Sequence, residues 1–150
     1  HPDLFEIEDH GARHVPAIDR AVSVYGIKSA GSAAAVAAEV EGGADAIAKA
    51  GLPAPRWFRG ATAKYTSSSI GAIEALGYRI AGFSVNADGG SLLGALATRR
   101  QVEKAKDGDV LIAHINQPTH AAGAGLVEGL KVLKARGVRF VRLEDAQSGV

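Results

Sequence analysis

The chain contains no cysteine, no methionine and no long apolar run. Without cysteine it forms neither disulfide bonds nor thiolate–metal sites, a composition compatible with any compartment. No apolar stretch approaches the roughly 18 residues of a membrane span, and the amino end does not resemble a signal peptide. Lys plus Arg number 17 and Asp plus Glu 16, with no block of like charge, which argues against nucleic acid or an anionic membrane as a partner.

The missing methionine also bears on where the chain begins. A translated chain starts with methionine, whereas this one starts with His1. Removal of the initiator normally requires a small second residue, which histidine is not. We therefore expect the chain to be a piece of a longer product, cut upstream of His1, and part of the active site to lie in the upstream segment.

What is present is a globular composition with an alternating pattern. At 150 residues, 47% hydrophobic and 22% charged, the chain is about one domain long. Short apolar stretches predict strands at 4–10, 56–61, 78–86, 110–115 and 138–144. Helices are predicted at 29–51, interrupted at Gly42 and Gly43, at 66–77, capped by Thr66 or Ser67, and at 93–106 and 124–137. This alternation predicts βαβ units and a parallel sheet, with too few strands for a closed (β/α) barrel but enough for the larger part of one.

Polar side chains follow four of the predicted strands, where parallel α/β folds place their ligand sites. We expect these residues to converge on one cleft: His10 and His14, Arg59, Asn86 and Asp88, and His114.

The spacing of His10 and His14 has two possible interpretations. On a helical turn, four-residue spacing places both side chains on one face with Cβ atoms about 5–6 Å apart, which suits one zinc ion. The same spacing also fits two solvated loop histidines, His10 and His14. His114 similarly fits a hydrogen-bonded core histidine, Arg59 a surface ion pair, and Asp88, within NADGG, an ordinary turn.

In this order the residues resemble the polysaccharide deacetylase family, the metal-dependent carbohydrate esterases with the NodB homology domain (carbohydrate esterase family 4). Residues 10–14, HGARH, are similar to its motif H-[ST]-x-x-H, with glycine in place of the hydroxyl residue. Arg59, within PRWFRGATAKY, matches the arginine of the family's third motif, an FRPPYG-like region, but the prolines of that motif are absent here. Asp88, within FSVNADGG, falls in the fourth region, which lacks the usual Asp-Trp. His114 ends VLIAH, which resembles L-x-L-x-H.

The resemblance extends from His10 to about Leu143. It implies an α/β fold, a partial or distorted (β/α) barrel, with residues 1–150 forming one NodB homology domain that lacks its N-terminal strand or strands. The family's first motif, T-F-D-D-G, is absent from the chain and belongs upstream of the histidine pair. By resemblance, its two aspartates would be the third metal ligand and the general base.

The resemblance also implies an activity, the removal of N-acetyl groups from a chitin- or peptidoglycan-like glycan by a metal-dependent hydrolase. His10 and His14 would bind a divalent metal, zinc by preference. Arg59 would orient the catalytic carboxylate, Asp88 would join the catalytic residues, and His114 would protonate the departing amine. The residues expected to contact the substrate are Val110, Ile112 and Tyr65.

Two other functions remain open on the same residues. One is a non-catalytic carbohydrate-binding relative, suggested by the degraded third and fourth motifs. The other is a hydrolase of the same fold acting on a different C–N amide bond. The resemblance favours an extracytoplasmic location, periplasmic or secreted.

Overall fold

The structure is a computed structural model that describes residue 1 and residues 3–146. Its contacts divide the chain into two compact units, His1–Gly82 and Phe83–Val150, and each unit is described by itself. The expectation of a single domain over residues 1–150 stays a prediction.

The first unit combines a small parallel sheet with two helices. Residue Asp9 makes a parallel bridge to Phe58, whose strand pairs in parallel with the next one along the chain. The predicted first strand, 4–10, is thus reduced to one bridging residue. The elements are β1 (Ser23–Val24) and β2 (Ile27–Lys28), which form an antiparallel hairpin, α1 (Ala33–Lys49), β3 (Trp57–Phe58), the 3-10 turn η1 (Ala61–Ala63), α2 (Ser67–Ala75) and β4 (Arg79–Ile80).

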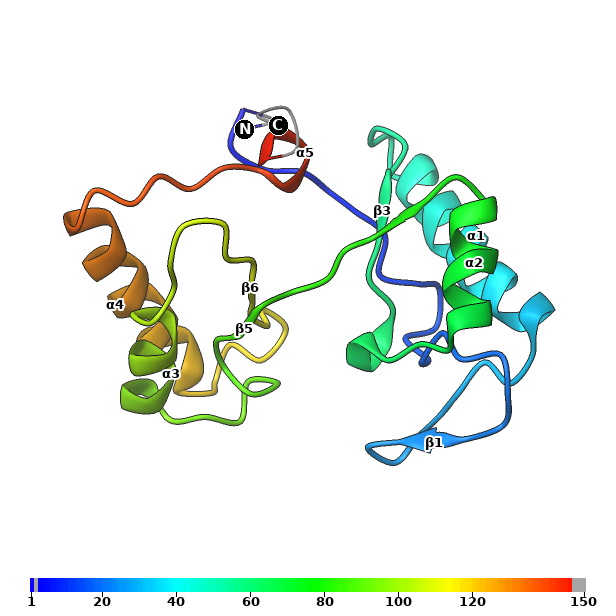
Figure 1. Cartoon of the computed structure of the whole chain (residues 1–150), viewed down its shortest axis with the longest axis horizontal. Coiled ribbons are helices and arrows are strands. Elements are labelled where there is room, and N and C mark those ends of the chain that lie inside the picture. Colours follow the sequence, from blue (N-terminus) through cyan, green and yellow to red (C-terminus); the bar gives the residue numbers. More distant parts are fainter. Residues whose placement is uncertain (2, 147–150) are drawn as a thin grey trace. The chain divides into compact units, whose positions relative to one another are not determined.

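The core of this unit lies between the sheet and the two helices, which run side by side in Figure 1. Each helix begins at the hydroxyl cap that the sequence favours: Ser32 accepts the N–H of Ala35, and Thr66 forms a capping box with Ser69. The prediction of a cap at Thr66 or Ser67 is therefore confirmed at Thr66. The buried apolar residues of the core are Ala17, Val36, Val40, Phe58 and Ile73.

Helix α1 continues through Gly42 and Gly43, so the predicted interruption is wrong. The two glycines serve a close approach instead. A Cβ at Gly43 would lie 2.0 Å from Oδ1 of Asp9, and one at Gly42 would lie 2.8 Å from Cβ of Ala12. Because glycine has no side chain, the histidine loop can lie directly against this face of the helix.

The second unit repeats the strand–helix alternation. Its elements are β5 (Val85–Asn86), α3 (Ala95–Val102), β6 (Leu111–Ile112), α4 (Ala122–Ala135) and the short α5 (Leu143–Ala146). Strands β5 and β6 pair in parallel. Helices α3 and α4 pack against each other (Figure 1), and a Cβ at Gly129 would lie 2.6 Å from Cβ of Val102. The buried core residues are Ala87, Val102 and Leu133.

Two further predicted strands differ from the structure. The stretch 78–86 forms β4 and β5, separated by residues 81–84, at the boundary between the two units. Residues 138–142 form neither helix nor strand, and the predicted last strand instead enters α5. An apolar pattern becomes a strand only where a second segment offers a hydrogen-bonding edge, and Phe140 and Val141 are instead exposed. The described residues form a mixed α/β structure without a closed barrel, and none of their helices is long and apolar enough to span a membrane.

Candidate functional site

The loop after Asp9 brings the two predicted metal ligands together. The rings of His10 and His14 have their centroids 5.0 Å apart, with an interplanar angle of 69°. The helical turn assumed from their spacing is absent, because residues 10–14 form a loop. Left-handed backbone at Gly11 (φ 90°) and at His14 (φ 56°) folds the loop back and closes the distance.

A hydrogen bond from the Nδ1–H of His10 to the backbone carbonyl of Arg59 fixes the first ring. Arg59 is held in turn, since its N–H donates to the carbonyl of Asp9 at 3.0 Å, continuing the parallel pairing of residue 9 with β3. A proton on Nδ1 leaves the lone pair of this imidazole on Nε2. Metal-binding histidines are commonly oriented in this way by a backbone carbonyl.

The donor set fits a divalent cation such as zinc, which accepts imidazole nitrogen ligands. The two rings supply two ligands, and within residues 1 and 3–146 no group of three or more His, Cys, Asp or Glu side chains surrounds a common point. A structural or catalytic zinc site needs at least three protein ligands. The described residues therefore fit part of a metal site, and a further ligand would have to come from outside them.

A buried carboxylate, Asp9, lies directly before His10 in the chain. It is 2% exposed, its Oδ1 accepts the N–H of Gly11 at 2.8 Å, and its Oδ2 has no partner. Burial raises the pKa of Asp9 to about 6; the Gly11 hydrogen bond opposes the shift, and the charges of Glu39 and Glu8 add to it. The sequence analysis predicts no role for Asp9.

In the second unit, His114 and Asp88 form a pair. The ring Nδ1–H of His114 donates to Oδ1 of Asp88 at 2.9 Å, and its backbone N–H donates to Oδ2 at 2.6 Å. Asp88 is 1% exposed, whereas one third of the His114 side chain is open to solvent. Asp88 does lie in a turn, as NADGG indicates, and its carboxylate also fixes the orientation and tautomer of the imidazole.

The pairing with His114 determines in which direction the pKa of Asp88 is shifted. Burial tends to raise the pKa of this carboxyl group, but hydrogen bonds from the ring and backbone of His114 outweigh it and hold the pKa below its usual value. An aspartate whose pKa is lower in the folded than in the unfolded chain stabilises the fold above the unfolded pKa of about 3.9. That stability is lost as the pH falls through the lower, folded pKa.

We therefore expect the melting temperature of Asp88→Asn to depend less on pH in the acid range than that of the wild type. Between pH 7 and pH 3 the wild-type melting temperature should fall more steeply than that of the variant, because asparagine does not take up a proton on unfolding. The matched control is Asp107→Asn, which removes a solvent-exposed aspartate of the same unit. Circular dichroism melts across this range measure the effect, and parallel curves for wild type and Asp88→Asn would contradict it.

The three predicted substrate residues lie in both units. Val110 precedes β6 and is 37% exposed, and Ile112, two residues on, is half-buried. Alternate residues of a strand share a face, so the two side chains lie on one side of it. Tyr65 belongs to the first unit, where its hydroxyl accepts the N–H of Gly60 at 2.9 Å; burial raises the pKa of this phenol. Their contact with substrate stays a prediction.

The structure thus forms two clusters from the predicted site residues. One contains His10, His14 and the carbonyl of Arg59, and the other contains Asp88 and His114. That all of these residues meet in one cleft stays a prediction. Asn86 has a local role, accepting the N–H of Gly89 at 2.8 Å.

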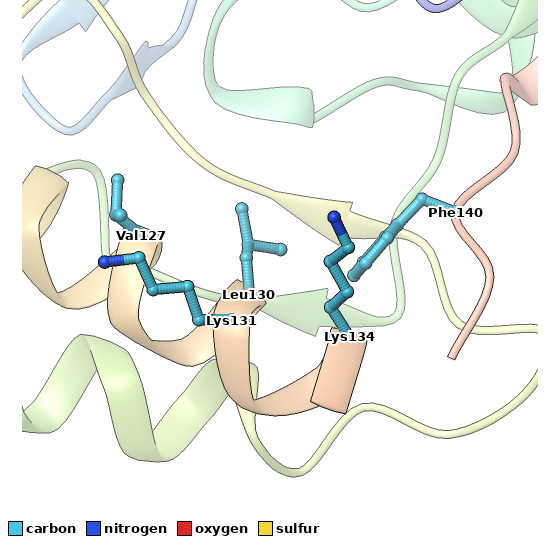
Figure 2. Close-up of a pocket in the computed structure, with 5 residues that line it drawn as sticks. All are labelled: Val127, Leu130, Lys131, Lys134 and Phe140. Carbon is cyan, nitrogen blue, oxygen red and sulfur yellow. The ribbon is translucent and has the colours of Figure 1, made fainter. Parts of the chain in front are cut away.

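A separate pocket lies on α4 in the second unit (Figure 2). Apolar side chains form much of its lining, and two lysines complete it. None of the predicted site residues lines it. The lining residues are Val127, Leu130, Lys131, Lys134 and Phe140.

Similar proteins are found by comparison with solved structures but not by comparison with protein families or curated sequences. No protein-family model matches the chain, and no curated protein sequence matches it. A family 4 carbohydrate esterase from Streptomyces lividans, solved in complex with acetate, superposes with a TM-score of 0.65 at 22% identity, over 78% of this chain and 59% of that one. A mutant of a CE4 family pseudoenzyme, with restored enzymatic activity, superposes with a TM-score of 0.74 at 16% identity, over 94% of this chain and 47% of that one.

These similarities establish the fold. The chain shares the polysaccharide deacetylase fold of the family 4 carbohydrate esterases, in agreement with the resemblance of its motifs. It spans 59% of the length of one of these structures and 47% of the other.

Proposed function

We propose that the chain is part of a metal-dependent deacetylase that hydrolyses the N-acetyl groups of a chitin- or peptidoglycan-like glycan. The observation that carries this proposal is the pair of His10 and His14, whose rings a loop brings close together, with the His10 ring oriented by the carbonyl of Arg59. The likeness to a family 4 carbohydrate esterase in complex with acetate supports it, because acetate is the product of N-acetyl hydrolysis.

We also propose how the sheet is completed. The two parallel sheets, β3–β4 and β5–β6, would be parts of a partial, distorted (β/α) barrel, and a segment outside the chain would supply its missing strand or strands. That segment would also carry the third metal ligand and the catalytic carboxylate. The guanidinium of Arg59 would orient this carboxylate by a charge-assisted hydrogen bond.

The chemistry divides between the two clusters. His10 and His14 would hold the divalent ion, and a bound zinc ion lowers the pKa of water toward about 7 and polarises a carbonyl oxygen. His114 would give a proton to the amine nitrogen as it leaves, and Asp88 would keep the imidazole oriented and stabilise its charged form. Val110 and Ile112 would line an apolar slot for the acetyl methyl group.

Tyr65 would contact the sugar. Because such glycans lie outside the cytoplasm, the protein would act there. The proposed partner is the glycan, and the proposal includes neither nucleic acid nor a membrane span.

A non-catalytic carbohydrate-binding role is the second candidate. Two observations favour it: a structural neighbour is a mutant of a pseudoenzyme, and the third and fourth motifs of this chain are degraded. The pairing of Asp88 with a partly exposed His114 favours catalysis, because a binding site has no need of an imidazole oriented for proton transfer.

Acetate release from N-acetylglucosamine oligosaccharides tests the proposal, in a protein that includes the upstream segment. We expect release that stops after treatment with a chelator and returns with added zinc. Binding of the oligosaccharide without acetate release would favour the carbohydrate-binding alternative. Release from small N-acyl compounds but not from the glycan would instead favour a hydrolase of another amide.

A further inference from the structure

Glu39 lies on α1 beneath the histidine loop and is fully buried. Its Oε1 accepts the backbone N–H of Arg13 at 3.0 Å and that of Val15 at 3.2 Å. Its Oε2 lies 3.4 Å from Nε of Arg13, and its own backbone carbonyl accepts the N–H of Ala12 at 2.9 Å. One helical residue therefore makes polar contacts with three residues of the loop, Ala12, Arg13 and Val15, which lie on both sides of His14.

The two backbone bonds bracket His14. The N–H of Arg13 belongs to the peptide bond between Ala12 and Arg13. The N–H of Val15 belongs to the peptide bond between His14 and Val15. Holding both restricts the backbone of His14, whose φ of 56° is a left-handed conformation that histidine adopts only at some cost. This conformation directs the chain back so that the two imidazoles meet at 5.0 Å.

The contact between loop and helix leaves no spare room. A Cβ at Gly11 would lie 2.5 Å from Oε1 of Glu39, and the φ of this glycine is 90°. The oxygen cannot move away cheaply, because it accepts the N–H groups of Arg13 and Val15. The glycine that replaces the hydroxyl residue of H-[ST]-x-x-H is thus matched to the buried carboxylate.

We infer that Glu39 is a positioning residue for the metal site: its carboxylate fixes the backbone of His14 and thereby the distance between the two imidazoles. The inference rests on the proposed function for its metal, but the positioning itself is a property of the metal-free chain. In this role Glu39 acts through the loop backbone.

Glu39→Gln tests the inference with almost no change of volume, and Glu41→Gln is its control, since it removes the same charge from an exposed position of the same helix. In the metal-free protein we expect amide hydrogen exchange at Arg13 and Val15 to accelerate by at least about tenfold in Glu39→Gln alone. In the full-length protein, calorimetry with zinc ions should show affinity weakened by roughly 10–100-fold.

A second variant approaches the same contact from the loop. Gly11→Ala would push the loop away from Glu39, and we expect the same loss of zinc affinity. Its control is Gly31→Ala, because Gly31 has a φ of 87° but its Cβ would meet only the carbonyl of Ser29, at 3.9 Å. The two alanine variants therefore carry similar backbone strain, and only one disturbs the loop. This pair also decides the matter if Glu39→Gln does not fold.

The outcomes separate the inference from the proposed function. Unchanged protection of Arg13 and Val15 in Glu39→Gln, or zinc affinity equal to wild type in both Glu39→Gln and Gly11→Ala, would overturn the positioning role. Zinc affinity lost equally in Gly31→Ala would overturn it as well. If the wild-type protein binds no zinc, the proposed function fails, and the exchange rates of the metal-free chain still decide whether Glu39 holds the loop.

Discussion

Replacing His114 by alanine is expected to reduce acetate release from a chitin-type oligosaccharide by roughly 10²–10⁴-fold, the usual contribution of a positioned general acid. The expectation follows from the pair with Asp88, whose buried carboxylate accepts both the ring and the backbone N–H of His114. Folding and zinc content should stay near those of wild type, because the imidazole is partly exposed and its removal leaves Asp88 its backbone donor.

A purely structural role for His114 predicts a different pattern. Loss of the ring would then lower stability by about 1–3 kcal/mol while the turnover of each folded molecule stayed unchanged. The matched control is His120→Ala, because the ring of His120 also bonds to the loop after β5, donating to the carbonyl of Ser91 at 2.9 Å. Thermal melts and acetate assays on the same preparations distinguish the two roles, in a chain that includes the upstream segment.

The capping of a helix and the parallel pairing of β3 with β4 and of β5 with β6 could be predicted from the sequence, whereas the antiparallel hairpin of β1 and β2 was not predicted. Thr66 caps α2, and the two sheets that join successive βα units are parallel, as alternation predicts. Strand length could not be predicted, because it depends on partners far away in the sequence. The apolar stretch at 138–144 has no partner edge among the described residues and forms no strand.

The histidine pair was predicted to be close, but for the wrong local reason. Four-residue spacing suggested a helical turn, whereas a loop with left-handed backbone at Gly11 and His14 brings the rings together. The predicted interruption of the helix at Gly42 and Gly43 rests only on the low helix propensity of glycine. Their function, the close approach of a loop to α1, is a tertiary contact that no local pattern encodes.

The sequence carries a signal for the buried Glu39. Together with Val36, Val40 and Gly43 it follows the i, i+3, i+4, i+7 spacing of one helical face, and these four are the buried residues of α1. A charged residue in such a stripe must find polar partners inside the protein, since burying an unpaired charge is costly. The sequence could show that Glu39 needs partners but not that the partners are the backbone of the histidine loop.

The metal site gives the second large effect. Replacing either His10 or His14 by alanine is expected to abolish stoichiometric zinc in a protein that includes the upstream segment. A catalytic zinc commonly has three protein ligands, and loss of one leaves too few to hold the ion against solvent. In the chain of 150 residues alone we expect only weak zinc binding, because the described residues bring together only two predicted ligands, His10 and His14.

The control for this experiment is His1→Ala, which removes a histidine whose side chain is 80% exposed. Elemental analysis of dialysed preparations measures the zinc content, and near-UV circular dichroism shows whether each variant is folded. Zinc content at the wild-type level in a folded His10→Ala or His14→Ala variant would contradict the assignment of the pair as ligands. Loss of zinc in His1→Ala as well would show that general histidine binding, and not the loop geometry, accounts for the metal.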